Sequence, residues 1–174
     1  MFSKTISALI GRRAAAPRVP APRVPEGTRV YAIGDIHGRL DLLAQLSERI
    51  VMDSGNFTGE RKVVVYLGDY VDRGPRSCEV IDLLADEPLA GFESVHLKGN
   101  HEQLLLDFLD DASVWPMWLF NGADATLSSY GVTPTAGADG LQAEFRASIP
   151  ARHLEFLGAL ALSPAEGDYM FVHA

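Results

Sequence analysis

The sequence has 174 residues, 47% of them hydrophobic, and a net charge of −8 at pH 7. That length and composition suit one domain with a buried core, and no run of about 18 apolar residues is present to span a membrane. The acidic balance argues against a nucleic-acid partner, and the single cysteine, Cys78, excludes an internal disulfide.

Residues 1–28 are a basic tail rich in alanine and proline. Residues 1–29 hold six lysines and arginines against one glutamate, so the remaining chain carries a net charge of −13. Sequence of this kind packs no core and resists regular structure, so we expect residues 1–28 to be disordered. In this tail the apolar stretch comes before the basic residues, which is the reverse of the order in a secretory signal. An organelle-targeting segment stays an alternative. Together with the single cysteine, this predicts a cytoplasmic location.

Regular patterns begin at Arg29 and alternate between strands and helices. Strands are predicted at 29–33, 62–67 and 94–97. Helices follow at 40–50, from Pro75 to near Pro88, and at 102–111. A short helix is predicted at 125–130, with turns around it that include one at Pro134. A helical stretch at 141–162 interrupted by Pro150 and a last strand at 168–172 complete the chain. Alternating strands and helices are typical of a largely parallel sheet, so the predicted class is α/β.

Polar side chains follow all four predicted strands. These residues are Asp35, His37, Asp69, Asn100, His101 and His173. Ligands of open α/β sheets bind beyond the carboxyl ends of the strands. We therefore expect these side chains to converge at one edge.

Carboxylate, amide and imidazole groups are ligands of paired divalent cations. Asp35 and His37 leave one turn on the same side, and Asp69 is placed to bridge two ions. Asn100 adds a neutral amide oxygen and His173 an imidazole. Two cations about 3.5–4 Å apart hold a phosphate and activate a water between them. Manganese suits this donor set, with iron or zinc as alternatives.

Three further residues indicate acid–base catalysis and phosphate binding. His101 could protonate a leaving oxygen, and Asp72 could orient His101. Arg73 could hold phosphoryl oxygens through its planar fork of donors. A surface ion pair is the alternative for Arg73.

Three blocks of the sequence resemble a known family. They are Gly34-Asp35-Ile36-His37-Gly38, Gly68-Asp69-Tyr70-Val71-Asp72-Arg73-Gly74 and Gly99-Asn100-His101-Glu102. They are similar to the signature blocks of calcineurin-like metallophosphoesterases, and most to the phosphoprotein phosphatase branch with its bacterial serine/threonine phosphatases. The resemblance runs from residue 30 to 174, and residues 171–174 are similar to the family's fourth block.

The resemblance implies a fold and a set of roles. The fold would be a four-layer α/β/β/α sandwich of two sheets flanked by helices. The first metal would be held by Asp35, His37 and Asp69. The second metal would be held by Asp69, Asn100 and His173. Asp72 and His101 would be the catalytic acid pair, with Arg73 on the phosphate.

The family pattern continues beyond the fourth block. It adds a second phosphate-binding arginine and a Gly-His block that gives the second metal another ligand, and neither occurs in these 174 residues. We therefore expect residues 29–174 to be a catalytic domain that is incomplete at its C-terminus, with part of the second sheet missing.

The predicted activity is hydrolysis of phosphate monoesters by a metal-activated hydroxide. Attack would be direct, because no cysteine or serine nucleophile lies at the strand ends. The resemblance favours phosphoserine and phosphothreonine in proteins, or a small phosphoester, as substrate. Two alternatives stay open: a diadenosine tetraphosphate hydrolase, and a truncated, non-catalytic metal-binding protein.

Four other residues are predicted to be structural. His96 lies within a strand and His153 within a helix, and isolated histidines lack the clustering of a site. Trp115 and Trp118 are predicted to pack in the core or at an interface.

Overall fold

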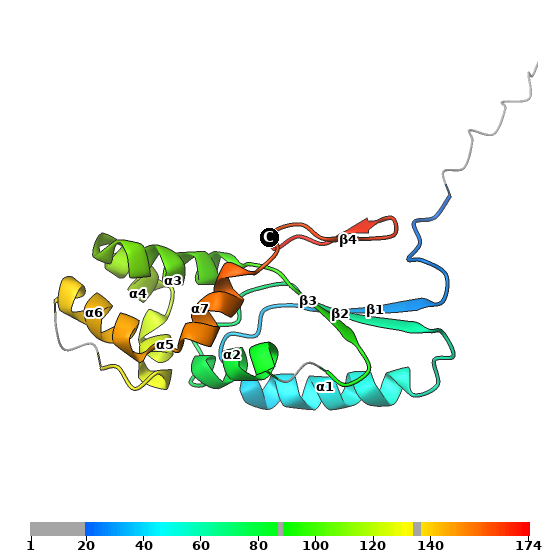
Figure 1. Ribbon diagram of the computed structural model, residues 1–174, viewed down its shortest axis with the longest axis horizontal. Helices are drawn as coiled ribbons and strands as arrows, with labels where there is room; N and C mark the ends of the chain where they lie inside the picture. Colours follow the sequence, from blue (N-terminus) through cyan, green and yellow to red (C-terminus); the bar gives the residue numbers. More distant parts are fainter. Residues whose placement is uncertain (1–19, 87–88, 134–136) are drawn as a thin grey trace, which may run out of the picture.

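The centre of the fold is a three-stranded parallel sheet (Figure 1). The computed structural model describes residues 20–86, 89–133 and 137–174. The strands are β1 (Thr28–Ile33), β2 (Arg61–Tyr66) and β3 (Glu93–His96), in the order β1-β2-β3. They pair parallel, with Ile33 opposite Tyr66 and Tyr66 opposite His96, so their carboxyl ends are aligned. The predicted strands and α/β class are confirmed.

A helix follows each of these strands, as predicted. They are α1 (Leu40–Ser54), α2 (Ser77–Asp86) and α3 (Asn100–Asp110). Alternate residues of β2 face opposite sides of the sheet. Val64 and Tyr66 pack into the larger core with residues of α1 and α2, whereas Val63 and Val65 face the other way. Both faces of β2 are therefore covered, as its continuous apolar run predicts.

The other helices gather beyond one end of the sheet (Figure 1). They are the 3₁₀ turn Ala112–Val114, α4 (Trp115–Phe120), α5 (Ala123–Ser129), α6 (Ala138–Ser148) and α7 (Ala151–Gly158). Pro150 separates α6 from α7 as predicted, because proline lacks the N–H that a continuous helix needs. Helix α7 ends at Gly158, so the expected extension to 162 is wrong. The predicted turn at Pro134 and the helix end at Pro88 lie outside the described residues.

The last predicted strand does not join the parallel sheet. β5 (Tyr169–Met170) pairs antiparallel with β4 (Ala165–Glu166) in a separate hairpin, on the side of the sheet opposite α1 (Figure 1). The expectation of four strands ending along one sheet edge is therefore wrong for the fourth. Phe171 packs on the face formed by Val63 and Val65, which holds the hairpin over the sheet. Of the predicted second sheet, the described residues form only this hairpin.

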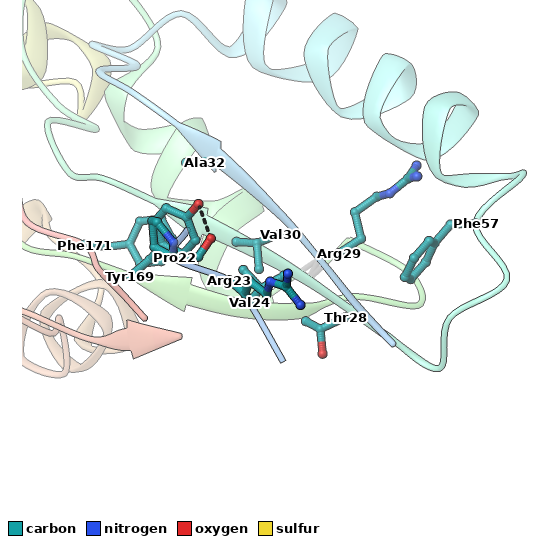
Figure 2. A pocket seen from close by; sticks show the side chains of 10 residues that line it. All are labelled: Pro22, Arg23, Val24, Thr28, Arg29, Val30, Ala32, Phe57, Tyr169 and Phe171. Atoms are coloured by element: carbon teal, nitrogen blue, oxygen red, sulfur yellow. Dashed lines mark hydrogen bonds between the residues drawn. The ribbon is translucent and has the colours of Figure 1, made fainter. Parts of the chain in front are cut away.

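Residues 20–27 are the described part of the basic tail outside β1, and Pro22 and Arg23 lie against the hairpin. Asp168 N donates to Arg23 O at 2.9 Å, and the Tyr169 hydroxyl donates to Pro22 O at 3.3 Å. A cavity of about 730 Å³ lies between this segment, β1 and the hairpin. Figure 2 shows the side chains that line it. Val30, Phe57 and Phe171 are among its lining residues, and none of the predicted site residues is. Among the helices of the described ranges, none has the length and apolarity to span a membrane.

His96 makes stability depend on pH. Its ring stacks on Tyr66 at 4.9 Å and contacts Phe156 at 5.1 Å, and burial lowers its pKa to about 4. The folded state thus holds the neutral ring while the unfolded chain takes up a proton near the ordinary value of 6.5. Above pH 6.5 this difference in proton binding costs no stability. As the pH falls towards 4, it lowers the free energy of unfolding by up to about 3 kcal/mol.

We expect His96→Phe to lose less stability than the wild type over this pH range. Phenylalanine keeps the ring contacts and has no proton to gain. Urea unfolding at pH 7 and pH 4.5 measures the difference. Equal losses in the two proteins would show that His96 does not contribute.

Candidate active site

The two loops that follow β1 and β2 are joined by backbone hydrogen bonds. The N–H groups of Ile36 and His37 both donate to Asp69 O, at 2.9 and 2.8 Å, and Gly38 N donates to Tyr70 O at 2.8 Å. These two loops therefore form one unit at the carboxyl edge of the sheet, where ligands of such sheets bind.

Four predicted site residues have a strained backbone. In the part of the chain that the structure describes, the non-glycine residues with positive φ are His37 (45°), Asp69 (56°), Asp72 (71°) and Arg73 (68°). Left-handed φ costs non-glycine residues of order 1–3 kcal/mol and is found preferentially at functional sites. The loops thus hold these side chains in directions that ordinary turns would not give.

Glycine is required where the loops touch. A Cβ on Gly99 would lie 2.1 Å from Asp69 Oδ1, and one on Gly74 would lie 2.0 Å from His37 O. Both distances are far below any allowed contact, so a side chain at either position would push a predicted ligand away. Gly74 and Gly99 therefore serve the close approach of the loops.

Glu102 ties the second loop to the third. Its side chain is fully buried and accepts the N–H groups of Asp69 (2.9 Å), Tyr70 (2.7 Å), Val71 (3.3 Å) and Gly99 (2.9 Å). Burial raises the pKa of Glu102, while these hydrogen bonds act in the opposite direction. No role was predicted for Glu102, although its place in the first turn of a helix, where carboxylates cap free N–H groups, is a signal for one.

We expect Glu102→Gln to lower the free energy of unfolding by about 2–4 kcal/mol, because the amide replaces one acceptor by a donor facing buried N–H groups. Urea unfolding measures the change. The exposed Glu144→Gln is the matched control and should be neutral. A similar stability for both variants would contradict this role for Glu102.

Three imidazoles turn the same nitrogen towards the site. The Nδ1 atoms of His37, His101 and His173 lie 2.8 Å from Val71 O, 2.7 Å from Asp72 Oδ2 and 2.8 Å from Leu67 O. Since these oxygens only accept, each Nδ1 must carry the donated hydrogen. A ring held in this way directs Nε2 at the site and, when it is neutral, offers the Nε2 lone pair there, which is how metal-binding histidines are commonly held.

Asp69 lies between two groups of potential ligands. Its Oδ2 is 3.8 Å from Nε2 of both His37 and His101, and its Oδ1 is 3.4 Å from His173 Nε2. Asp35 Oδ2 lies 3.8 Å from His37 Nε2, and Asn100 Oδ1 lies 3.0 Å from His173 Nε2. The two Asp69 oxygens thus face different partners, as a bridging carboxylate requires.

These residues fit a pair of divalent cations. The potential ligand atoms of His37, Asp69 and His101 lie within 4.8 Å of one another, and so do those of Asp35, Asp69 and His173. Carboxylate oxygens and unprotonated Nε2 atoms repel one another unless a cation or a proton lies between them. Such a mixture of oxygen and imidazole donors suits Mn²⁺, Fe or Zn²⁺.

Asp72 and His101 form a buried pair beside these ligands. His101 is 1% exposed and Asp72 is fully buried. Burial lowers the pKa of His101, but the hydrogen bond to Asp72 and the charges of Asp69 and Asp72 outweigh it, so the pKa lies above its ordinary value. A raised pKa favours the protonated ring that a general acid needs.

Arg73 reaches over the two imidazoles from the second loop. Its Nη1 lies 2.8 Å from His37 Nε2 and its Nη2 lies 3.1 Å from His101 Nε2. Its backbone N–H donates to Gly122 O at 3.1 Å, which anchors the loop to the segment between α4 and α5. All eight residues predicted for the site therefore lie together, and no surface ion pair of Arg73 is found among the described residues.

Two residues that were not predicted to belong to the site contact Asp72. Trp118, predicted to be core, donates its Nε1–H to Asp72 Oδ2 at 2.9 Å, and Thr126 donates its hydroxyl to Asp72 Oδ1 at 2.6 Å. Both are fully buried. No local pattern identifies them, because their positions depend on how α4 and α5 pack against the second loop.

Comparison with known proteins supports a common origin for this site. Residues 28–159 match the family model described as calcineurin-like phosphoesterase. Serine/threonine-protein phosphatase 1 of Salmonella typhimurium is 33% identical over 95 residues, which are 55% of this chain and 39% of that protein. The symmetrical bis(5'-nucleosyl)-tetraphosphatase of Dechloromonas aromatica is 31% identical over 144 residues, 83% of this chain and 42% of that protein.

A solved structure is similar in fold. The cold-active protein-tyrosine phosphatase of a psychrophilic Shewanella species has a TM-score of 0.53 at 21% identity, covering 87% of this chain and 45% of that one. The chain thus spans less than half the length of these relatives. The family match covers most of the chain, including the three loops described above. The chain belongs to the calcineurin-like phosphoesterase family.

Proposed function

We propose that this chain belongs to a metal-dependent phosphatase that hydrolyses phosphate monoesters, and that residues 29–174 are part of its catalytic domain. The observation that carries the proposal is the central position of Asp69, whose two carboxylate oxygens face His37 and His173. The buried Asp72–His101 pair beside it supplies an acid of raised pKa. Together they meet the needs of ester hydrolysis: a place for cations, a place for phosphate and a proton donor.

We assign roles to the residues of the site as follows. Asp35, His37 and Asp69 would hold one cation, and Asp69, Asn100 and His173 a second. When bound, cations at these positions would supply charge that stabilises the phosphoryl group and would lower the pKa of the attacking water. Arg73, which projects over His37 and His101, would donate to the phosphoryl oxygens.

His101 would then act on the leaving group. The oxygen of water forms a bond to phosphorus while the bond to the ester oxygen breaks. The Nε2–H of the imidazolium gives its proton to that ester oxygen, so the products are an alcohol and inorganic phosphate. The proton lost by the water restores the imidazolium. Asp72 stabilises the positive ring throughout and keeps Nε2 directed at the site.

Phosphoserine and phosphothreonine in proteins are the substrates that we favour. Several relatives carry the name serine/threonine-protein phosphatase, among them proteins of Salmonella typhimurium and Escherichia coli at 33% and 35% identity. The second candidate is hydrolysis of a dinucleoside tetraphosphate, because the bis(5'-nucleosyl)-tetraphosphatase similarity extends over 83% of the chain.

Hydrolysis of para-nitrophenyl phosphate with added Mn²⁺ tests the proposal. We expect turnover that a chelator abolishes and Mn²⁺ restores. Comparing a phosphothreonine peptide with diadenosine tetraphosphate then separates the two substrate classes. If metal binds with no turnover of any of the three, the chain is a non-catalytic metal-binding protein and the proposal is wrong.

A further inference from the structure

The carboxylate of Asp72 is held by more than its histidine. It is buried, and four elements of the fold surround it: the loop after β2 that carries it, α3 with His101, α4 with Trp118 and α5 with Thr126. A buried carboxylate costs several kcal/mol unless donors surround it. The donors present here decide how it is oriented.

Both oxygens of the carboxylate have a donor other than His101. Trp118 Nε1–H donates to Oδ2 at 2.9 Å, the oxygen that also accepts from His101 Nδ1 at 2.7 Å. The Thr126 hydroxyl donates to Oδ1 at 2.6 Å, and the same hydroxyl oxygen accepts Asp72 N–H at 2.8 Å. Donors on opposite oxygens fix the plane of the carboxylate, which His101 alone could not do.

The donors are themselves firmly placed. The indole of Trp118 packs between Phe108 and Phe145, with ring centroids 5.0 and 5.6 Å away. Thr126 Oγ1 lies 3.1 Å from the buried Ser77 hydroxyl at the start of α2. Neither donor carries a charge, so they compensate the carboxylate without competing with the imidazolium for it.

We propose that Trp118 and Thr126 are positioning residues, which hold both carboxylate oxygens of Asp72 and thereby fix the ring of His101 with Nε2 towards the phosphoryl site. The proposal rests on the function proposed above for His101. Neither residue touches the substrate or a cation; each acts through Asp72. A purely structural Trp118 would need only its ring, and a purely structural Thr126 only its volume.

The substitutions Trp118→Phe and Thr126→Val remove the donors and keep aromatic packing and side-chain volume. The matched control is Trp115→Phe, the same change on the same helix at a ring that packs on Phe108 but is not among the donors to Asp72. Urea unfolding and a dispersed NMR spectrum verify that each protein is folded. If the double variant does not fold, the two single variants replace it.

Leaving-group dependence is the first measurement. A poor leaving group such as phenolate needs the general acid more than para-nitrophenolate does. We expect the kcat ratio of phenyl phosphate to para-nitrophenyl phosphate to fall about tenfold in the double variant, with unchanged KM and Mn²⁺ affinity. An unchanged ratio, whether or not both rates fall, would overturn the proposal. Trp115→Phe should keep the wild-type ratio.

A second measurement does not depend on activity. The Nδ1–H proton of His101, assigned by its absence in His101→Asn, should give a downfield NMR signal protected from exchange in the protein without added Mn²⁺. We expect this signal to be lost to solvent exchange in the double variant and kept in Trp115→Phe. A signal that persists unchanged in the folded double variant would overturn the positioning role. If the wild type shows no turnover, the proposed function is wrong, and this signal still decides whether the two donors fix His101.

Discussion

Asp69→Asn should lower turnover of para-nitrophenyl phosphate by at least about a thousandfold, because one substitution impairs both cation positions. Each Asp69 oxygen faces a different histidine, His37 on one side and His173 on the other. An asparagine amide offers a single neutral oxygen, which cannot bridge two cations. Elemental analysis of the purified variant should find that both ions are lost together.

The variant Asp35→Asn is compared with Asp69→Asn, because it should affect one cation position and not both. Asp35 is 57% exposed and is assigned to one cation position, so its loss should weaken one ion and leave the other. If Asp69→Asn retained two ions per chain, the carboxylate would not bridge them. Equal loss of one ion in both variants would contradict the bridging role as well.

His101→Ala is expected to keep both cations and to lose turnover by a factor of about 10²–10⁴, the usual contribution of a positioned acid or base. The geometry leaves a clear rival, since His101 Nε2 lies 3.8 Å from Asp69 Oδ2 and could ligate a cation. The hydrogen bond to the buried Asp72 and the raised pKa favour a proton donor. Cation content and turnover, measured on the same preparation, separate the two roles.

His153→Gln is the matched control for His101. His153 is also fully buried and lies 2.8 Å from a carboxylate, Asp82, and 2.8 Å from the Tyr130 hydroxyl. It joins α7 to α2 and α5 away from the site, so its loss should lower stability while folded protein keeps its turnover. Loss of cations in His101→Ala would make that residue a ligand and would overturn the general-acid assignment.

The three loops at the sheet edge could be predicted from the sequence because their design is local. Each strand ends in a short glycine-flanked block, and parallel strands must place such blocks side by side. The positions of Asp35, Asp69 and Asn100 follow from this alone. The strain at Asp69 and Asp72 and the contacts of Gly99 are consequences of the same crowding.

Other features could not be predicted, because they depend on packing between distant segments. His173 was expected at the end of a fourth strand of the parallel sheet. Instead it follows the β4–β5 hairpin, and its Nδ1 contacts Leu67 O from there. Trp118 shows only an apolar pattern in the sequence, and its indole N–H finds Asp72 through the packing of α4. A side chain that packs through its ring and donates through its edge has no local signature.

The central claim is that the strand-end loops place two cations on either side of Asp69. Anomalous diffraction from crystals grown with Mn²⁺ tests it directly. We predict two anomalous peaks about 3.5–4 Å apart, with the Asp69 carboxylate in contact with both. No peak, or a single peak that Asp69 does not contact, would contradict the account.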